Sequence, residues 1–476
     1  MSVPTCSSGS GAHAIPSKHK RSLPDMKERL DRCRNAFSTR VGKTTFVTMT
    51  KHSKWNRSAM ASDPTRKKLA LFGMFGVGNL GNECTLQTML HNLRRFLPNA
   101  EVCCSCADPS DTASRYGIPA CKIREMSLPP INNRPLRLLR RIVVGIPIES
   151  YRWLKVIRRL AGVQLLIMTG TGMLSDLDIS PFGLHYDIIR WSIVAKLCRC
   201  KVMFVSVGVG PIRHPLSRFL VKMALRMADY RSYRDTFSKS YVEAMGISTV
   251  GDAVYPDLAF SLPEGMLPHA RSRHGRAPVI GIGLITNDKR RATLEKVEAI
   301  YDDYIKKLGA FVVWLIEHKY TVQLIIGDVT YDSRARQDLI AFLERSGLKY
   351  DSGQLIHGCA SSVSELLSQL AGTDIVVASR FHNVLLALLL GKPVVAISFH
   401  EKVDSLMNAM GLTQFCQDIE HVDVDKLIHQ LTTLEENSES IKREVSRQSE
   451  VWRRALEDQY EALFKVNPLT GRSLVD

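Results

Sequence analysis

The chain has 476 residues, 45% of them hydrophobic, which suits a globular protein of two or more domains. No apolar run approaches the ~20 residues that span a bilayer, and the N-terminal region lacks the apolar core of a signal peptide. The eleven cysteines show no metal-ligand spacing and indicate reduced thiols in a core. These features argue against a membrane-spanning or disulfide-stabilised chain and predict a cytoplasmic protein.

The net charge of +17 is concentrated in two segments. Residues 1–68 hold 15 Lys and Arg against 4 Asp and Glu, and residues 122–160 hold 10 against 2. The rest of the chain is therefore close to neutral, as in an ordinary enzyme. One basic tail and one basic segment favour an acidic or membrane surface, and we expect no nucleic-acid partner.

The first part of the chain is predicted to be a tail. Residues 1–66 are rich in Ser, Thr, Lys and Arg and show no sustained hydrophobic period, which predicts a disordered basic tail. The folded chain is expected to begin at Lys68 with a buried strand, a glycine-rich turn and a helix that opens near Asn82 or Glu83.

The glycine-rich turn carries Gly76, Gly78 and Gly81 in the spacing G-x-G-x-x-G. Such a turn before a helix can bind a dinucleotide, can hold a phosphate or sugar, or can serve only as a tight turn, and the sequence leaves all three open. The nearest candidate for a ribose-binding acid, Asp108, comes later than a dinucleotide site requires. Gly78 and Asn79 are candidate donor-binding residues.

Residues 122–160 form a basic insert within the predicted first domain, residues 67–262. The last part of this insert, ESYRWLKVIRR, places apolar side chains among basic ones with helical spacing. Interfacial membrane helices and ordinary surface helices both show this pattern. An anionic membrane surface is therefore a candidate partner.

Strands and helices then alternate to the end of the first domain. The glycine turns TGTGMLSD and GVGPI follow strands that end at Met168 and Val207, and a third strand ends just before Arg234. Because ligands bind at the carboxyl ends of parallel strands, Gly208 and Arg234 are candidate site residues. His185, just beyond the first of these turns, is either a site residue or a structural histidine.

A second domain follows a linker that contains Pro and Arg, residues 263–277. Residues 278–435 repeat the alternation of buried strands and helices, and a long charged helix is expected within residues 436–476. Alternating β and α segments predict parallel sheets that are covered by helices on both faces. The predicted fold class is α/β, with two Rossmann-like doubly wound domains facing across a cleft (GT-B-like), a C-terminal helix and the basic tail.

The stretch from Asp374 to Asp404 predicts one βαβ unit, with a polar turn over residues 379–383 and a helix over residues 384–390. Four cationic or proton-carrying side chains follow its two strands: Arg380, His382, His400 and Lys402. Such a group at one sheet edge suits an anionic ligand.

Five segments in this order resemble the polysaccharide pyruvyl transferase family, over about residues 68–412. They are GVGNLGNE, GTGMLSD, GVGPI, RDTFS and SRFHNVLLALLLGKPVVAISFHEKV, which begin at Gly76, Gly170, Gly208, Arg234 and Ser379. The R-x-H turn, the following G-x-P and the later lysine are the most specific part.

The resemblance implies transfer of the enolpyruvyl carbon skeleton of phosphoenolpyruvate to two hydroxyls of one sugar, which gives a cyclic pyruvate ketal and phosphate. It implies donor-site and catalytic roles for Arg234, Arg380 and His382. It also matches Lys402 to a family lysine and, more loosely, His185 to an acceptor-side histidine.

The residue types suit this chemistry on their own. Guanidinium groups bind phosphate and carboxylate, so Arg234 and Arg380 can grip the donor from two domains. His382 is the candidate acid that protonates C3 of the donor. Lys402 can neutralise the leaving phosphate, and a second histidine, His400 or His185, can accept a proton from the attacking hydroxyl. The scheme needs no metal and no cofactor, with phosphoenolpyruvate as co-substrate.

The acceptor is expected to be a glycan or lipid-linked oligosaccharide at the inner face of the membrane, of unspecified sugar. Two other functions remain open from the sequence. A GT-B glycosyltransferase with a nucleotide-sugar donor would have the same architecture, and so would a non-catalytic glycan- or membrane-binding relative.

Overall fold

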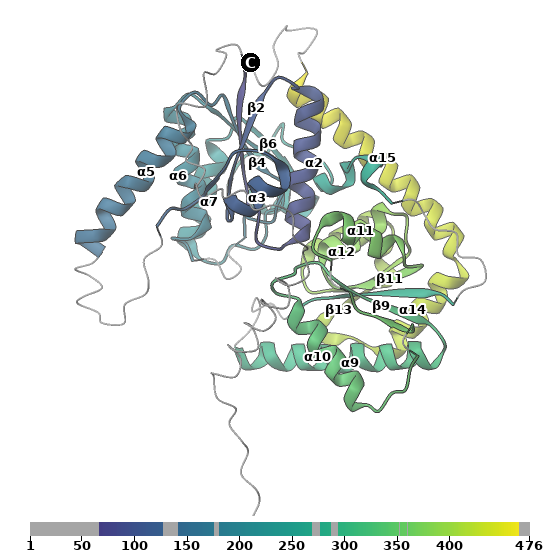
Figure 1. Cartoon of the computed structure of the whole chain (residues 1–476). Helices are drawn as coiled ribbons and strands as arrows, with labels where there is room; N and C mark the ends of the chain where they lie inside the picture. Colours follow the sequence, from purple (N-terminus) through teal and green to yellow (C-terminus); the bar gives the residue numbers. More distant parts are fainter. Residues whose placement is uncertain are drawn as a thin grey trace, which may run out of the picture. The chain divides into compact units, whose positions relative to one another are not determined.

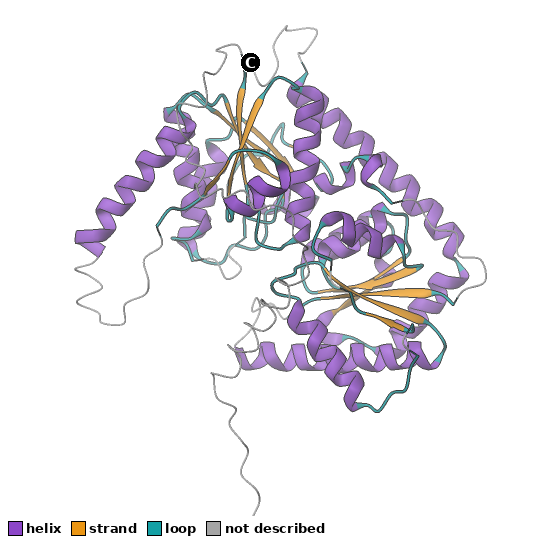
Figure 2. Cartoon of the chain, viewed as in Figure 1, coloured by secondary structure: helices purple, strands orange, loops and turns teal. Residues whose placement is uncertain are grey.

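The computed structural model of the chain describes residues 66–126, 141–175, 180–268, 277–286, 294–351, 353–358 and 360–465 (Figures 1 and 2). All of these residues belong to one compact unit that begins at Ser62. Apart from Arg66, the predicted basic tail lies outside the described residues, and so does most of the predicted linker. The predicted domain boundaries therefore stay predictions.

Within the described ranges, the first sheet has seven parallel strands in the order β3-β2-β1-β4-β5-β6-β7. They are β1 (Lys68–Phe72), β2 (Glu101–Cys106), β3 (Ala120–Lys122), β4 (Leu165–Thr169), β5 (Lys201–Val207), β6 (Tyr230–Tyr233) and β7 (Ala253–Val254). Every residue of β4 is buried, as expected for a strand covered on both faces. The strand order reverses beside β1, which is the Rossmann pattern, and ligands bind at the carboxyl edge beside that reversal.

Several helices of this part begin at a residue whose side chain caps them. The helices of this part are α2 (Leu80–Phe96), α3 (Pro109–Tyr116), α5 (Ile146–Leu160, preceded by the π-helical η2, Arg141–Gly145), α6 (Leu184–Leu197), α7 (Pro215–Arg226) and α8 (Thr236–Ala244), with the 3₁₀ turns η3 (Leu258–Ser261) and η4 (Glu264–Met266). Asn79 caps α2, because its Oδ1 accepts a hydrogen bond from Asn82 N at 3.1 Å. Asp235 caps α8 in the same way. Both caps follow a strand of the sheet and fix the start of a helix at its carboxyl edge.

The second sheet has six parallel strands among the described residues, in the order β10-β9-β8-β11-β12-β13. They are β8 (Val279–Leu284), β9 (Thr321–Ile326), β10 (Leu355–Ile356), β11 (Ile375–Ala378), β12 (Val394–Ser398) and β13 (Cys416–Asp418). β8, β11 and β12 are buried throughout. The order reverses beside β8, so this sheet repeats the pattern of the first.

The helices of the second part are α9 (Leu294–Glu317), α10 (Ser333–Arg345), α11 (Val363–Ala371), α12 (Phe381–Leu389), α13 (Glu401–Ala409), α14 (Val424–Glu436) and α15 (Ser438–Phe464), with the 3₁₀ turns η5 (Thr413–Phe415) and η6 (Ile419–His421). α12 differs from its prediction in a way that matters for the site. The polar residues after Ser379 were expected in a turn, but the helix begins at Phe381, so His382 lies in its first turn. Polar residues suit that position because the first-turn N–H groups have no partner within the helix.

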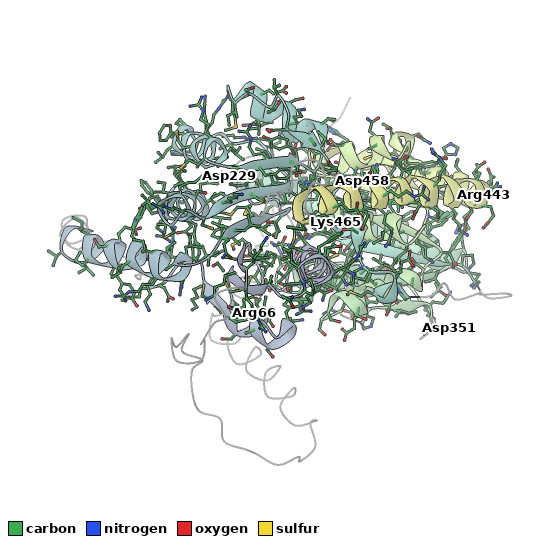
Figure 3. All side chains as sticks on the ribbon, turned by 90° about the horizontal axis from the view of Figure 1, so that it is seen from above. Arg66, Asp229, Asp351, Arg443, Asp458 and Lys465 are labelled. Carbon is green, nitrogen blue, oxygen red and sulfur yellow. The ribbon has the colours of Figure 1, made fainter. Side chains whose placement is uncertain are left out.

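The C-terminal helix α15 contacts elements of both parts of the structure, and Arg443, Asp458 and Lys465 mark its course in Figure 3. Buried Gln459 accepts a hydrogen bond from Ser206 Oγ at 3.1 Å and donates to Ser232 Oγ at 2.6 Å, both in the first sheet. Near the middle of α15, Ser449 Oγ donates to Leu388 O of α12. A long charged helix was predicted within residues 436–476, and α15 is that helix.

The predicted α/β class with two Rossmann-like sheets is confirmed. The amphipathic helix of the basic insert is also present, as α5. No helix in the described parts of the chain combines the length and hydropathy needed to cross a membrane.

Candidate functional site

Four of the predicted side chains gather where the carboxyl ends of the two sheets meet. We call Arg234, Arg380, His382 and Lys402 the edge cluster. The ring of Phe381 is a shared contact, because Arg234 Cζ lies 4.9 Å and Lys402 Nζ 5.4 Å from its centroid. Arg234 follows β6 of the first sheet, whereas the other three residues belong to the second part. Arg234 and Arg380, which follow strands of the two sheets, therefore both lie close to His382, and their role as donor ligands stays a prediction.

His382 lies at the centre of the edge cluster. Burial lowers the pKa of its imidazole well below the usual value, and the positive charges of Lys402, Arg234 and Arg380 lower that pKa further. Its Nε2 is buried and has no hydrogen-bond partner among the described residues. The ring lies against Gly81 of α2, where a β-carbon would overlap it. An unpaired buried ring nitrogen that faces cations is a strong sign of a binding or catalytic role.

Arg234 is held from several sides. Its Nε lies 3.3 Å from Asp235 Oδ2, and its Nη1 lies 3.6 Å from Asp257 Oδ2. Its guanidinium fills the space beside Gly208, where a β-carbon would overlap the group. The side chain is only 7% exposed, so its charge acts in a desolvated environment. Gly208 was predicted to bind the donor; its observed contact is with this arginine.

Arg380 makes a two-point ion pair with a buried carboxylate. Its Nε and Nη2 donate to Asp332 Oδ2 and Oδ1, both at 2.7 Å, and Nη2 lies 4.0 Å from Asp328 Oδ2. Asp332 has no exposed surface and also accepts hydrogen bonds from the backbone N of Thr286 and of Asp328. Arg380 thus anchors the loop that precedes α10.

His400 and Lys402 open α13. His400 Nδ1 accepts a hydrogen bond from Lys402 N at 3.2 Å, so the ring caps the helix, and the same nitrogen lies 3.2 Å from Glu401 Oε2. The other ring nitrogen of His400, Nε2, faces Gly210 of the first part, 3.5 Å from the position of a β-carbon. The Lys402 ammonium lies over the rings of Phe381 and Phe399. Lys402 belongs to the edge cluster, whereas His400 lies beside it with a capping role.

Gly78 and Asn79 join the two parts of the structure. Gly78 O accepts a hydrogen bond from Val329 N at 2.9 Å, and Asn79 Nδ2 donates to Asp328 Oδ2 at 3.2 Å. Gly78 has a φ of +83°, and a β-carbon there would crowd Thr330 Oγ1. Their observed contacts are between loops, and donor binding by them stays a prediction.

His185 is fully buried near the start of α6. The contacts that define the edge cluster do not include it. Its acceptor-side role stays a prediction.

Four further residues of this region were not predicted: Gly81 as a neighbour of His382, and Phe381, Asp257 and Asp332. Phe381 lies inside the R-F-H motif, so its position near the site could be predicted from the sequence, but its ring contacts could not. Asp257 precedes an apolar run, which is the pattern of a helix cap. Asp332 and Gly81 depend on contacts between distant segments and give no local signal.

The described cysteines and metal-ligating residues were also surveyed against the sequence predictions. The eight described cysteines are all free, and five of them are buried: Cys84, Cys104, Cys106, Cys121 and Cys200. Nowhere in the described ranges do three or more His, Cys, Asp or Glu side chains gather as a metal site.

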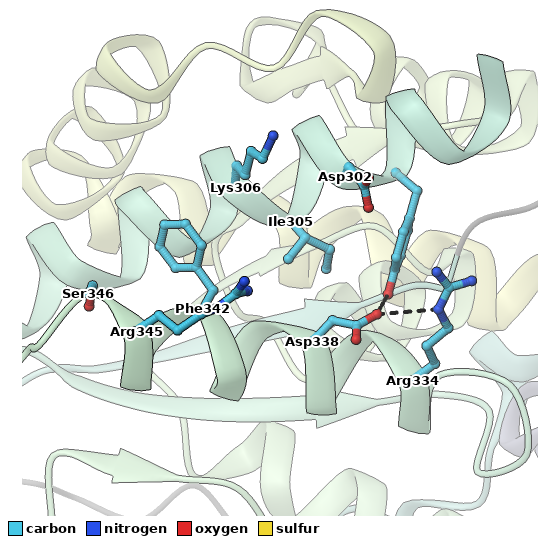
Figure 4. Close-up of a pocket in the computed structure, with 9 residues that line it drawn as sticks. Asp302, Ile305, Lys306, Arg334, Asp338, Phe342, Arg345 and Ser346 are labelled. Atoms are coloured by element: carbon cyan, nitrogen blue, oxygen red, sulfur yellow. Dashed lines mark hydrogen bonds and ion pairs between the residues drawn. The ribbon is translucent and has the colours of Figure 1, made fainter. Parts of the chain in front are cut away.

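A separate groove of about 560 Å³ lies between α9 and α10 (Figure 4). At one end Tyr301 Oη donates to Asp338 Oδ2 at 2.7 Å, and Arg334 Nε lies 3.3 Å from the same oxygen. Ile305 and Phe342 form an apolar part of its wall. None of the predicted site residues lines this groove, and its polar end is internally paired, so it is distinct from the edge cluster.

Comparison with known proteins agrees with the geometry. A sequence profile of the family described as polysaccharide pyruvyl transferase matches residues 79–401. The amylovoran biosynthesis protein AmsJ of Erwinia amylovora is 22% identical over 267 residues, which cover 54% of this chain and 63% of that protein. The chain thus spans less than two thirds of this relative.

Solved structures share the fold. A putative UDP-N-acetylglucosamine 2-epimerase from Listeria monocytogenes has a TM-score of 0.54 at 12% identity, covering 83% of this chain and 97% of that one. The UDP-GlcNAc 2-epimerase of Neisseria meningitidis, bound to UDP-GlcNAc, has a TM-score of 0.51 at 12% identity, covering 82% and 100%. At such identities the likeness concerns the fold alone.

Proposed function

The chain belongs to the polysaccharide pyruvyl transferase family, and we propose that it transfers the enolpyruvyl group of phosphoenolpyruvate to two hydroxyls of one sugar residue. The product is a cyclic pyruvate ketal on a cell-surface polysaccharide or its precursor, and phosphate is released. The observation that carries the proposal is the buried, unpaired Nε2 of His382 among three cationic side chains.

Donor binding follows from the charges of the edge cluster. Phosphoenolpyruvate has a phosphate and a carboxylate on a small frame, and guanidinium and ammonium groups bind both. Arg234 and Lys402 are the proposed direct ligands, since both lie over the Phe381 ring beside His382. Arg380 is proposed to add positive charge and to fix the loop before α10, because two of its nitrogens already bind Asp332.

The proton transfers can pass through His382. With a lowered pKa, the imidazole is neutral before the donor binds, so it can take the proton of the attacking sugar hydroxyl and deliver it to C3 in the same step, in which that oxygen bonds to C2 and the C2=C3 double bond becomes single. The donor's negative charge offsets the nearby cations and raises the pKa of the ring, which favours this transfer through the imidazolium.

The bond changes balance over the two steps. C2 of the donor forms bonds to both sugar oxygens, and its bond to the phosphate oxygen breaks. Of the two hydroxyl protons, one ends on C3 and the other leaves with phosphate. Lys402 is proposed to stabilise the departing phosphate. The sequence analysis named His382 only as an acid; its lowered pKa adds the role of base.

Phosphate release from phosphoenolpyruvate in the presence of candidate glycans tests the proposal, with mass analysis of the glycan for a pyruvate ketal. We expect His382→Gln to lower kcat by about 10²–10⁴-fold because proton transfer is lost. The matched control is His421→Gln, at a histidine with an 83% exposed side chain outside the cluster.

Three results would contradict the proposal. Wild-type turnover in His382→Gln would remove His382 from the mechanism. Thermal stabilisation by a nucleoside diphosphate, with none by phosphoenolpyruvate, would favour a nucleotide-sugar glycosyltransferase. Binding of glycan without phosphate release from any donor would indicate a non-catalytic relative.

We also propose that the enzyme works at the cytoplasmic face of an anionic membrane, on a lipid-linked acceptor. Apolar side chains line the outer side of η2 and α5: Val143, Ile146, Tyr151, Leu154 and Ile157 are 60%, 61%, 38%, 43% and 39% exposed. Arg158 is exposed beside them. Figure 1 shows α5 next to α6, which its other side contacts. An apolar stripe flanked by basic residues suits the interface of a bilayer.

Co-sedimentation with vesicles tests this location. The double variant Leu154→Asp, Ile157→Asp should lose binding to vesicles that contain anionic lipid, because two carboxylates would enter the apolar stripe. The control is Leu197→Asp, at a residue that is 71% exposed at the end of α6. Equal binding by all three proteins would contradict a role for α5.

A further inference from the structure

Asp257 is a buried carboxylate beside the edge cluster that the mechanism has not used. It lies between β7 and η3 and is 4% exposed. Burial raises the pKa of this carboxyl, and the positive charges of Arg234 and Lys402 oppose that rise. A carboxylate in such a place is costly unless it has a partner, so its position calls for an explanation.

The two oxygens of Asp257 have different contacts. Oδ1 caps η3 by accepting a hydrogen bond from Ala259 N at 3.1 Å. Oδ2 makes no hydrogen bond within the described residues and lies 3.6 Å from Arg234 Nη1. A cap needs only one oxygen, and an asparagine would serve it equally well. The second oxygen is therefore the part of the carboxylate that the fold itself does not require.

The contacts of Arg234 show what Oδ2 does. Asp235 lies beside Nε, Asp257 lies beside Nη1, and the Phe381 ring covers one face of the guanidinium. Nη2 points to the glycine turns after β5 and β4, where it is close to Gly208 and 4.0 Å from the position of a β-carbon on Gly172. Glycines let a ligand approach the backbone closely.

We propose that Asp257 is a positioning residue, which turns Arg234 so that its Nη2 edge meets the donor anion beside the two glycine turns. This inference rests on the proposed function, since it assigns a partner to the same site. Asp257 itself does not touch the donor.

The elements packed around Asp257 hold its carboxylate in a fixed position. η3 contacts α2, α15 and α12, and α12 carries His382. The charge of Asp257, after burial, raises the pKa of Cys84 on α2 and of Tyr460 on α15, so both side chains lie close to it. Asp235 is the other nearby acid and Lys402 the other nearby cation. The carboxylate thus aligns a residue of the first sheet with the helix that carries the catalytic histidine.

The test compares wild type with Asp257→Asn, which keeps the cap on η3 and removes the charge beside Arg234. We expect KM for phosphoenolpyruvate to rise about tenfold with a smaller change in kcat, because a charge-assisted contact to the donor-binding arginine is lost. The matched control is Asp418→Asn, since Asp418 caps the 3₁₀ turn η6 through the same kind of contact, Oδ1 to Glu420 N at 2.7 Å.

A pH profile distinguishes positioning from a purely structural role. Without the negative charge of Asp257, the positive charges of Arg234 and Lys402 act on His382 with less compensation. The pKa of His382 then falls further, so the acidic limb of kcat/KM moves to lower pH in Asp257→Asn. A structural defect would lower activity without moving this limb.

A double-mutant cycle with Arg234→Lys completes the test. In the Arg234→Lys background, Asp257→Asn should change KM by less than about twofold, because the positioned group is already altered. Additive effects, or an Asp257→Asn enzyme with the KM and pH profile of wild type, would overturn the inference. If wild type itself releases no phosphate from phosphoenolpyruvate, the proposed function has failed, and that result is separate from either outcome.

Discussion

The two sheet edges that meet at the site contribute different things. The second part supplies Arg380, His382 and Lys402, of which Arg380 is held by an ion pair with Asp332. The first part supplies Arg234 and a set of glycines that make room, as Gly208 does for this arginine and Gly81 for His382. The second edge therefore supplies three of the four side chains of the edge cluster, and the first edge supplies Arg234 and the glycines beside which Arg234 and His382 lie.

This division explains why each edge alone is incomplete. The His382 ring belongs to α12, yet its position depends on Gly81 of α2, because a β-carbon there would overlap the ring. Arg234 belongs to the first sheet, yet the ring that it covers, Phe381, belongs to the second part. We expect loss of the Arg380 pair at the second edge to lower stability, and substitutions of Gly81 and Arg234 at the first edge to lower activity.

The largest expected effect is at the second edge. Arg380→Gln leaves the fully buried Asp332 without its two-point partner and should lower the free energy of unfolding by about 3–5 kcal/mol. Urea denaturation measures this loss. The control is Arg447→Gln, whose pair with Glu444 is exposed and should contribute far less to stability. Equal losses in the two variants would mean that the Asp332 pair is not structural.

The next effect is at the first edge. Gly81→Ala adds a methyl group where the His382 imidazole lies, so the ring must move, and kcat should fall by about 100-fold. Gly265→Ala is the control, because no atom lies within 4 Å of its added β-carbon. Unchanged activity in Gly81→Ala would show that the ring position is not limiting.

A smaller effect is expected from Arg234→Lys. The lysine keeps the charge but loses the planar group over Phe381, so KM for phosphoenolpyruvate should rise about tenfold while the melting temperature stays close to that of wild type. Arg231→Lys should lower the melting temperature and leave KM close to that of wild type, because Arg231 binds Asp252 and backbone carbonyls. If Arg234→Lys lowers stability more than Arg231→Lys, the assignment of Arg234 to the donor is wrong.

The smallest effect concerns pH. The lowered pKa of His382 predicts that kcat/KM is flat near pH 7 and falls only as the ring gains a proton, below the usual imidazole pKa of about 6.5. Removing a nearby positive charge raises that pKa, so Lys402→Gln should move the limb to higher pH, and Arg380→Gln should move it less. If the acidic limb of kcat/KM lies at the same pH in wild type, Lys402→Gln and Arg380→Gln, a group other than His382 controls the pH profile.

Much of the fold was predictable because buried strands of a parallel sheet are continuous apolar runs. β5 and β6 end where the sequence predicts, at Val207 and just before Arg234. The start of α12 was wrong by three residues, since a polar first turn looks like a loop. β7 and β13 were not predicted, because Ala-Val and Cys-Gln-Asp are not continuous apolar runs.

The site was predictable only as far as motifs mark strand ends. Arg234, Arg380, His382 and Lys402 follow strands, and the carboxyl edge of a parallel sheet brings such residues together. The partners Asp257 and Asp332 were not predictable, because an ion pair between segments far apart in sequence leaves no local pattern. The loop contacts of Gly78 and Asn79 were not predictable for the same reason, and donor binding by these two residues stays a prediction.

The C-terminal helix sets the order in which the enzyme is completed on the ribosome. α15 is synthesised after both sheets, and at about 5–20 residues per second its 27 residues take roughly 1–5 seconds. Until then Phe260, which packs on Trp452, and Phe96, which packs on Tyr460 and Phe464, lack their final partners. A nascent chain that stops before Ser438 would therefore keep aromatic surface exposed, which is the kind of surface that chaperones recognise.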